Sequence, residues 1–163
     1  LGLDAIPSFE ARFSSLQSRL EVIAERGAPT ARDRAAVIAY GELLATALGE
    51  AFLCAQGLQA VWLDARQVLR AVRREAATEQ AAYLSATCDF RPDAAVQAKL
   101  REMGSIVVTQ GFIARDSAGD TVLLGRGGSD TSAAYFAAML EAQELEIWTD
   151  VPGMFSANPR ATP

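Results

Sequence analysis

The spacing of the apolar residues changes near Gly57 and divides the sequence into two parts. Up to that glycine, apolar side chains recur every three or four positions, which is the spacing of one face of an α-helix. Beyond it, short apolar and β-branched runs alternate with alanine-rich stretches of helical length. Strands that alternate with helices are typical of α/β sandwiches. The sequence therefore predicts a helical lobe over residues 1–57 and an α/β part over residues 58–163.

Two helices are expected in the helical lobe. The first begins near Pro7 and ends at Gly27-Ala-Pro29, because proline suits a first helical turn and glycine suits a helix end. The second begins near Thr30, where Thr30-Ala-Arg-Asp33 is a variant of a capping box, and Gly57 ends it. The apolar face predicted for this second helix consists of Val37, Leu44, Leu48, Ala51 and Phe52.

Strands and helices alternate in the α/β part. The expected strands are short and apolar or rich in β-branched residues: Leu58–Leu63, Ser105–Ile113, Thr121–Leu124 and Glu144–Trp148, with Trp148 in the core. Residues 116–120 form the turn of a hairpin. The expected helices are Pro92–Met103 and Ser129–Leu140. The charged stretch Arg66–Ala82 is predicted to begin as a helix and continue as a surface loop, and residues 151–163 are predicted to form a loop.

Composition removes several classes of function. The formal charge of −5 argues against a nucleic-acid partner, since phosphate binding needs a basic face. No apolar run approaches the roughly 20 residues of a membrane span. We expect a cytoplasmic protein, because two thiols that are not paired suit a reducing compartment. The chain has no histidine, which excludes histidine-based triads and metal sites. Cys54 and Cys88 are expected to be buried thiols, and without a CxxC pair no zinc site is predicted.

The most informative stretch is Leu124-Gly-Arg-Gly-Gly-Ser-Asp-Thr-Ser132, in which glycines join a strand to a helix. Glycines permit a close approach between backbone and ligand, and a helix N-terminus favours an anion. Arg126 adds a planar guanidinium suited to a carboxylate or a phosphate. The alternative is a plain tight turn in which Ser129 caps the helix and Arg126 lies in solvent. The spacing fits neither a dinucleotide-binding fingerprint nor a P-loop, so the residues alone predict an anion site without identifying the anion.

Four blocks of sequence closely resemble, in order, the signature segments of the aspartate kinases. The blocks are Tyr40-Gly-Glu-Leu-Leu44, Val108-Thr-Gln-Gly-Phe-Ile113, Gly125-Arg-Gly-Gly-Ser-Asp130, and Leu145-Glu-Ile-Trp-Thr-Asp-Val-Pro-Gly-Met-Phe155 with Asn158-Pro-Arg160. The resemblance implies the three-layer α/β/α sandwich of the amino-acid kinase superfamily, incomplete in this chain. It also implies that the chain is an internal piece of an aspartate kinase catalytic domain.

The resemblance implies a site for L-aspartate. Arg126 and Ser129 would hold a carboxylate of the substrate, Glu42 would meet its ammonium group, and Phe112 would line the pocket. Asp130 would act with Arg126 in catalysis by orienting the reacting groups. Each residue also has an ordinary interpretation: Glu42 suits a solvated helix face, and Phe112 suits the core.

The resemblance further implies a nucleotide site. Thr149 and Asp150, at the end of the last expected strand, would meet ATP, and Phe155 and Arg160 would close on it. Asp150 is equally suited to an ordinary turn before Val-Pro-Gly. Mg²⁺ would bridge the phosphates of ATP, without a metal site of its own in this chain.

The reaction implied is transfer of phosphate from ATP to the β-carboxylate of aspartate, the first step of lysine, threonine and methionine biosynthesis. A carboxylate needs no general base near neutral pH, so the absence of histidine does not oppose this reaction. The family also has a Lys-Phe-Gly-Gly-Thr-Ser phosphate loop, which this sequence lacks, and Lys99 cannot replace its lysine by position. The longer parent protein is therefore expected to be active, and this chain by itself is expected to be inactive.

Other interpretations stay open on the sequence alone. One is a related kinase with a different acceptor, such as uridylate, and another is a non-catalytic, kinase-like domain that binds a metabolite. Exposed sheet edges would also allow the chain to pair with itself as a homo-oligomer.

Overall fold

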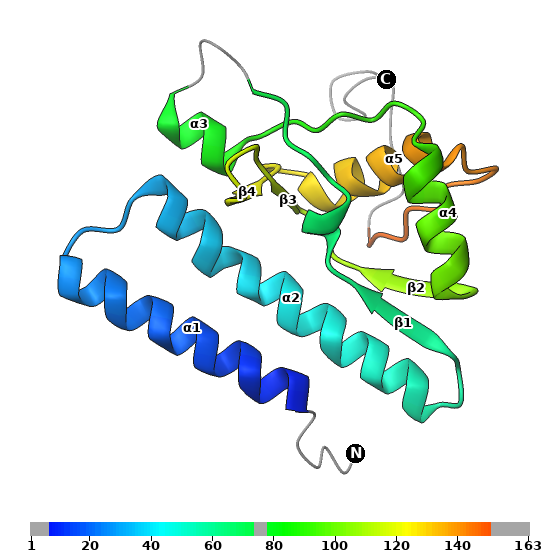
Figure 1. The fold of residues 1–163 in the computed structure, drawn as a ribbon, viewed down its shortest axis with the longest axis horizontal. Coiled ribbons are helices and arrows are strands. Elements are labelled where there is room, and N and C mark those ends of the chain that lie inside the picture. Colours follow the sequence, from blue (N-terminus) through cyan, green and yellow to red (C-terminus); the bar gives the residue numbers. More distant parts are fainter. Residues whose placement is uncertain (1–6, 74–77, 151–163) are drawn as a thin grey trace, which may run out of the picture.

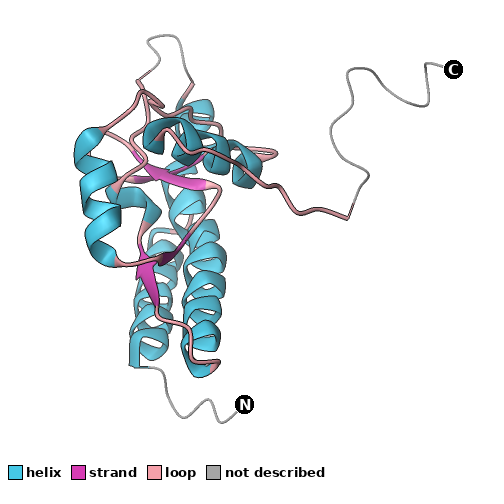
Figure 2. Cartoon of the chain, turned by 90° about the vertical axis from the view of Figure 1, so that its right-hand side faces the viewer, coloured by secondary structure: helices cyan, strands magenta, loops and turns pink. Residues whose placement is uncertain are grey.

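The computed structural model describes residues 7–73 and 78–150. The helices are α1 (Pro7–Arg26), α2 (Ala31–Ala55), α3 (Glu79–Leu84), α4 (Ala94–Met103) and α5 (Gly128–Leu140), with a 3₁₀ turn, η1 (Ala65–Gln67). The strands are β1 (Ala60–Leu63), β2 (Ile106–Thr109), β3 (Ile113–Arg115) and β4 (Thr121–Leu123). In Figure 1, α1 and α2 lie side by side, and the α/β part covers the other side of α2. Figure 2 shows the same two helices standing together below the strands.

The bounds of the two N-terminal helices agree with the prediction, and the capping box is confirmed. Thr30 Oγ1 accepts a hydrogen bond from the Asp33 amide (3.2 Å), and Asp33 Oδ2 accepts one from the Thr30 amide (2.8 Å). Arg26, at the end of α1, also pairs with Asp33. The hydrogen bonds from Thr30, followed by the charge of Arg26, lower the pKa of Asp33. One carboxylate therefore begins α2 and fixes the connection from α1.

The buried face of α2 differs from the predicted one. Its core side is a row of small residues and one leucine at four-residue spacing: Ala35, Ala39, Leu43 and Ala47. Leu48 and Phe52, two of the predicted core residues, are 42% and 47% exposed. Alanines let the helix backbone come close to β1 and β4, with which α2 is in contact. The larger side chains on α2 lie outside this narrow space.

By length and composition alone, α2 is a helix that could cross a membrane. Core helices of soluble proteins and signal sequences meet the same two criteria. The sequence prediction did not recognise this property, because polar residues interrupt the apolar run. In this structure α2 contacts α1 on one side and the strands on the other.

Parallel pairing joins β1 to β2, with Ala60 opposite Ile106 and Leu63 opposite Thr109. The carboxyl ends of both strands therefore meet at one edge of the sheet. The prediction of a single strand over Ser105–Ile113 is wrong, because the chain breaks after β2. Phe112 has a φ of +67°, in the left-handed region, which ends one strand and redirects the chain into β3.

The hairpin of β3 and β4 is confirmed, with Ile113 opposite Leu123. Leading into it, residues 65–73 do not continue as the predicted helix. Only η1 is helical, after which Val68 and Leu69 enter the core. The backbone of Arg70 then forms a parallel β-bridge with that of Arg115 in β3. The helix predicted from Pro92 begins at Ala94, because Asp93 caps it.

The strand predicted over Glu144–Trp148 does not form. Residues 141–150 are exposed and irregular, and Trp148 is 90% exposed rather than in the core. A strand is stable only when a neighbour pairs with it. Within the described part of the chain, β2 pairs with β1 and nothing pairs with residues 144–148. The loop predicted over 151–163 lies outside the described residues.

The core lies between α2, η1 and the hairpin, with α5 closing it. Its largest fully buried apolar side chains are Leu69, Ile113 and Val122. Cys88 belongs to this core, and its burial raises the pKa of the thiol to about 12. Cys54 was also expected to be buried but is exposed, and both thiols are free.

Candidate substrate site

The glycine-rich turn leaves the N-terminus of α5 open. Gly127 is the N-cap residue, has a φ of +70° and offers no side chain to cap the helix. The amides of Ser129 and Asp130 make no hydrogen bond with the part of the chain that the structure describes. Such amides point outward with the positive end of the helix dipole. The geometry therefore suits an anion, and Ser129 is not the cap that the alternative interpretation required.

Arg126 directly precedes Gly127, the N-cap residue of α5. It is exposed and makes no ion pair or hydrogen bond with any described residue. Ser129 and Asp130 are also exposed. A guanidinium that no described residue neutralises adds to the positive potential at the start of α5.

The block that ends β2 touches the glycine-rich turn directly. A Cβ atom on Gly111 would lie 2.9 Å from the Cα atom of Ser129, and one on Gly128 would lie 2.6 Å from the Phe112 ring. Both positions therefore require glycine, because no side chain fits there. Two of the blocks that the sequence singled out come together at these two contacts.

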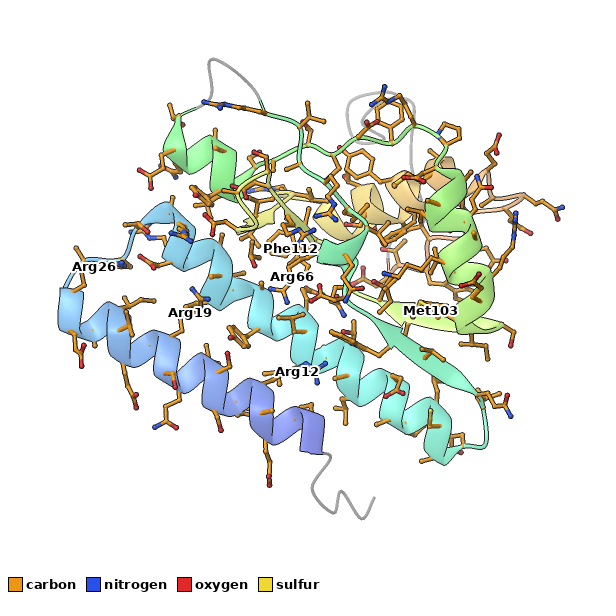
Figure 3. The ribbon with its side chains drawn as sticks, viewed as in Figure 1. Arg12, Arg19, Arg26, Arg66, Met103 and Phe112 are labelled. Atoms are coloured by element: carbon orange, nitrogen blue, oxygen red, sulfur yellow. The ribbon has the colours of Figure 1, made fainter. Side chains whose placement is uncertain are left out.

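Phe112 is held against the turn by its backbone. Its amide donates to Ser132 Oγ (2.8 Å), and its carbonyl accepts from the Leu124 amide (2.9 Å). Ser132 is buried and also donates to the Gly128 carbonyl (2.6 Å). Phe112, labelled in Figure 3, is half-buried and packs against the core, so part of the residue still faces outward. The two interpretations of Phe112, as core and as pocket residue, are compatible.

A buried polar network connects this region to the helix that carries Glu42. Gln110, which is 1% exposed, accepts from the Ala65 amide (2.8 Å) and donates to Thr46 Oγ1 (2.7 Å). Thr46 Oγ1 also accepts from Trp62 Nε1 (3.0 Å) and donates to the Glu42 carbonyl (2.8 Å). The network fixes α2 against the carboxyl ends of β1 and β2, with Glu42 one turn from Thr46.

The sequence prediction did not find this network. Gln110 lay inside a recognised block but had no assigned role, and Thr46 was not noticed. The available signal was a threonine four residues after Glu42 on an otherwise apolar helix, since residues four apart share a helix face. Glu42 itself is half-buried, between the solvated and the enclosed positions that the sequence allowed.

A second polar cluster occupies the end of β1. Arg66 donates to Asp64 through Nε (2.9 Å) and Nη2 (2.6 Å), and to Thr121 Oγ1 through Nη1 (2.9 Å). Burial raises the pKa of Asp64, but the hydrogen bonds and charge of Arg66 outweigh this effect and lower it. Arg12 of α1 lies 4.3 Å above the Trp62 ring, beside the same cluster (Figure 3). These contacts hold the helical lobe on the α/β part.

The residues expected to bind a nucleotide are not brought into the site by the described part of the chain. Thr149 and Asp150 are exposed in the irregular segment after α5. Phe155 and Arg160 lie outside the described residues. Among the described residues, no three His, Cys, Asp or Glu side chains are grouped as a metal site would require.

The chain matches the amino acid kinase family over residues 5–163. It is 41% identical over 126 residues to the bifunctional aspartokinase/homoserine dehydrogenase 2 of Escherichia coli, and 38% identical over 149 residues to the lysine-sensitive aspartokinase 3 of the same organism. These matches cover 77% and 89% of this chain but only 15% and 32% of the two relatives. The chain therefore spans at most about a third of either relative.

Two crystal structures of E. coli aspartokinase III have the same fold. The complex with aspartate and ADP, in the R-state, superposes with a TM-score of 0.74 at 35% identity and covers 93% of this chain and 33% of its own. The complex with lysine and aspartate, in the T-state, gives a TM-score of 0.70 at 33% identity, and 34% of that structure is covered. The incomplete α/β fold with a helical N-terminal part is therefore a portion of the fold seen in these two structures. The chain belongs to the amino acid kinase family.

Proposed function

We propose that this chain forms the aspartate-binding part of an aspartate kinase, in which a longer protein transfers phosphate from ATP to the β-carboxylate of L-aspartate. The observation that carries the proposal is the contact of Gly111 with Ser129, which joins two aspartate-kinase-like blocks beside open amides and an unneutralised arginine. The relatives named aspartokinase, and the aspartokinase III structure with aspartate and ADP, support this choice of substrate class.

In this proposal Arg126 and the amides at the start of α5 hold a carboxylate of aspartate. A carboxylate accepts two parallel hydrogen bonds from a guanidinium, so the contact fixes orientation as well as charge. Glu42 meets the substrate ammonium, Phe112 bounds the pocket, and Asp130 orients the reacting groups. The remaining carboxylate is then the nucleophile, and positioning supplies much of the rate.

ATP would supply the phosphoryl group, and Mg²⁺ would enter with its phosphates. Thr149, Asp150, Phe155 and Arg160 are proposed to contact the nucleotide on the resemblance alone. We assign no step to a metal held by this chain. An ATP-dependent biosynthetic enzyme of this kind is expected in the cytoplasm.

The isolated chain is proposed to have no kinase activity. Lys99 is its single lysine, and its Nζ donates to Gln67 Oε1 (2.8 Å), between α4 and η1. No lysine is therefore available beside the glycine-rich turn to offset the charge of a transferring phosphoryl group.

Hydroxylamine trapping tests the function. The full-length protein that contains this chain is incubated with ATP, Mg²⁺, aspartate and hydroxylamine, and aspartyl hydroxamate is measured. Arg126→Ala should lower the yield by about tenfold to a hundredfold, the size of a lost charge-assisted pair. The exposed Arg101 of α4 provides the matched control, because Arg101→Ala should leave the yield unchanged.

Replacing aspartate by glutamate, acetylglutamate or uridylate tests the acceptor, with release of ADP as the readout, because UDP formed from uridylate gives no hydroxamate. Product from one of these and none from aspartate would reject aspartate as the substrate. No product from any acceptor would instead favour a metabolite-binding domain without catalysis.

A further inference from the structure

A pocket at the turn end of the β3–β4 hairpin has no role in the proposed function. It measures about 480 Å³ and is lined by Arg70, Ala71, Arg115 and the turn residues Asp116–Gly119. The glycine-rich turn follows the opposite end of the hairpin, since Leu124 pairs with Phe112 there. Three residues of β-strand, about 10 Å, separate the two ends. The pocket is therefore distinct from the candidate substrate site.

Two arginines line this pocket from neighbouring backbone segments. The backbones of Arg70 and Arg115 form an isolated parallel β-bridge, and the Ala71 amide donates to the Arg115 carbonyl (2.8 Å). Neither guanidinium forms an ion pair with a described residue. Arg70 makes only a long hydrogen bond to the Gln67 carbonyl (3.4 Å). Two positive charges that line one pocket repel each other, and a bound anion would reduce the repulsion.

The Arg115 side chain, beside this pocket, also contains a buried donor without an acceptor. Arg115 Nε is inaccessible to solvent and has no hydrogen-bond partner among the described residues. Buried polar atoms in folded proteins are nearly always hydrogen-bonded, and an unsatisfied one requires an explanation. The Nη atoms of Arg115 are not enclosed in this way, so they are the donors that a ligand in the pocket could reach.

The acidic residue of the pocket is already engaged. Asp116 Oδ1 accepts from the amides of Ala118 (3.0 Å) and Asp120 (2.8 Å), which closes the hairpin turn. Asp120, on the other side of the turn, pairs with Arg32 and accepts from Tyr83 (3.1 Å). The Ser117 hydroxyl and amide make no hydrogen bond with described residues, so they add donors to the pocket.

We propose that this pocket binds the phosphate group of a small anionic ligand, held between the guanidinium groups of Arg70 and Arg115, with Ser117 as a third donor. Guanidinium forks match the tetrahedral oxygens of phosphate in pairs. The inference is independent of the aspartate kinase proposal, because it uses none of the residues assigned to aspartate or to the nucleotide.

Titration of the full-length protein that contains this chain with inorganic phosphate tests the proposal. Ionic strength is held constant with chloride, and the Arg115 Nε–H resonance is followed by nitrogen-15 NMR. Phosphate bound at the neighbouring Nη atoms should shift this resonance saturably. Arg70→Gln should weaken the apparent affinity by about tenfold, because one charge-assisted contact is lost. Arg101→Gln and Arg126→Ala should leave it unchanged.

Two results would overturn the proposal. One is an Arg115 Nε–H resonance that does not move during the titration. The other is an equal loss of affinity in Arg70→Gln and Arg101→Gln, which would indicate screening by the whole surface. Arg70 is exposed, so its substitution tests the pocket even where a change at the half-buried Arg115 prevents folding.

Discussion

Gly111 lies against the backbone of Ser129, so closely that a Cβ atom added to Gly111 would come within 2.9 Å of the Ser129 Cα atom. The end of β2 and the first turn of α5 therefore pack backbone to backbone. Their relative position is set by the absence of a side chain. A site assembled from these two segments depends on this glycine.

Gly111→Ala is expected to destabilise the fold by about 1–3 kcal/mol, because the methyl group meets backbone atoms that cannot rotate away. Urea unfolding measures the loss. Gly49→Ala on α2 is the control, since a Cβ atom there has nothing within 4 Å. It should stabilise the chain by about 0.5–1 kcal/mol, the helix preference of alanine over glycine. Equal stability of Gly111→Ala and the wild type would contradict the observed packing.

Thr46→Val should lower the free energy of unfolding by about 1–3 kcal/mol, because Gln110 and Trp62 lose a buried acceptor. The hydroxyl also links this network to the turn of α2 that carries Glu42. In the full-length protein the KM for aspartate should therefore rise more than the KM for ATP. Thr46→Ser keeps the hydroxyl and should restore both properties. A Thr46→Ser variant as impaired as Thr46→Val would show that the methyl group, and not the network, is responsible.

Stability is expected to fall with acid through Asp33. Its pKa is lowered in the folded state, so its contribution is complete above the unfolded value of about 3.9 and is lost as pH drops through the folded value. The difference in free energy of unfolding between the wild type and Asp33→Asn should therefore be largest near neutral pH and shrink below about pH 4. Urea unfolding at a series of pH values measures it, with Thr30→Ser, which keeps the cap, as control. A difference that does not change with pH would contradict this role.

The two cysteines should differ in reactivity. Cys54 is exposed, whereas Cys88 is 4% exposed and has a pKa of about 12. At pH 8 only about one part in 10⁴ of Cys88 is thiolate, the form that reacts. A disulfide reagent should label one thiol per chain quickly and the second only as the chain unfolds. Cys54→Ser should remove the fast phase and Cys88→Ser should keep it; fast labelling of Cys54→Ser would contradict the burial of Cys88.

Much of the candidate site could be located from the sequence, because its parts are contiguous. The turn Gly125–Asp130 contains the glycines, the arginine and the helix start within six positions, and the block around Phe112 is equally compact. What the sequence could not provide was their contact, which depends on the left-handed Phe112 and on packing across the 17 residues of chain between Gly111 and Ser129. The Gln110 network was missed for the same reason.

The sequence by itself determined the features that rest on local hydrogen bonds and backbone preferences. The capping box of Thr30 and Asp33, the ends of α1 and α2, the hairpin turn at Asp116 and the start of α5 all depend on residues within a few positions of one another. Such signals hold whatever the rest of the chain does.

Only the tertiary structure decided which surfaces are buried and which strands pair. The alanine row of α2, rather than Leu48 and Phe52, faces the strands because the space there admits only small side chains. Residues 144–148 have strand-like sequence but stay irregular, since no described strand offers them a partner. Burial and pairing need two segments at once, and neither segment alone specifies the other.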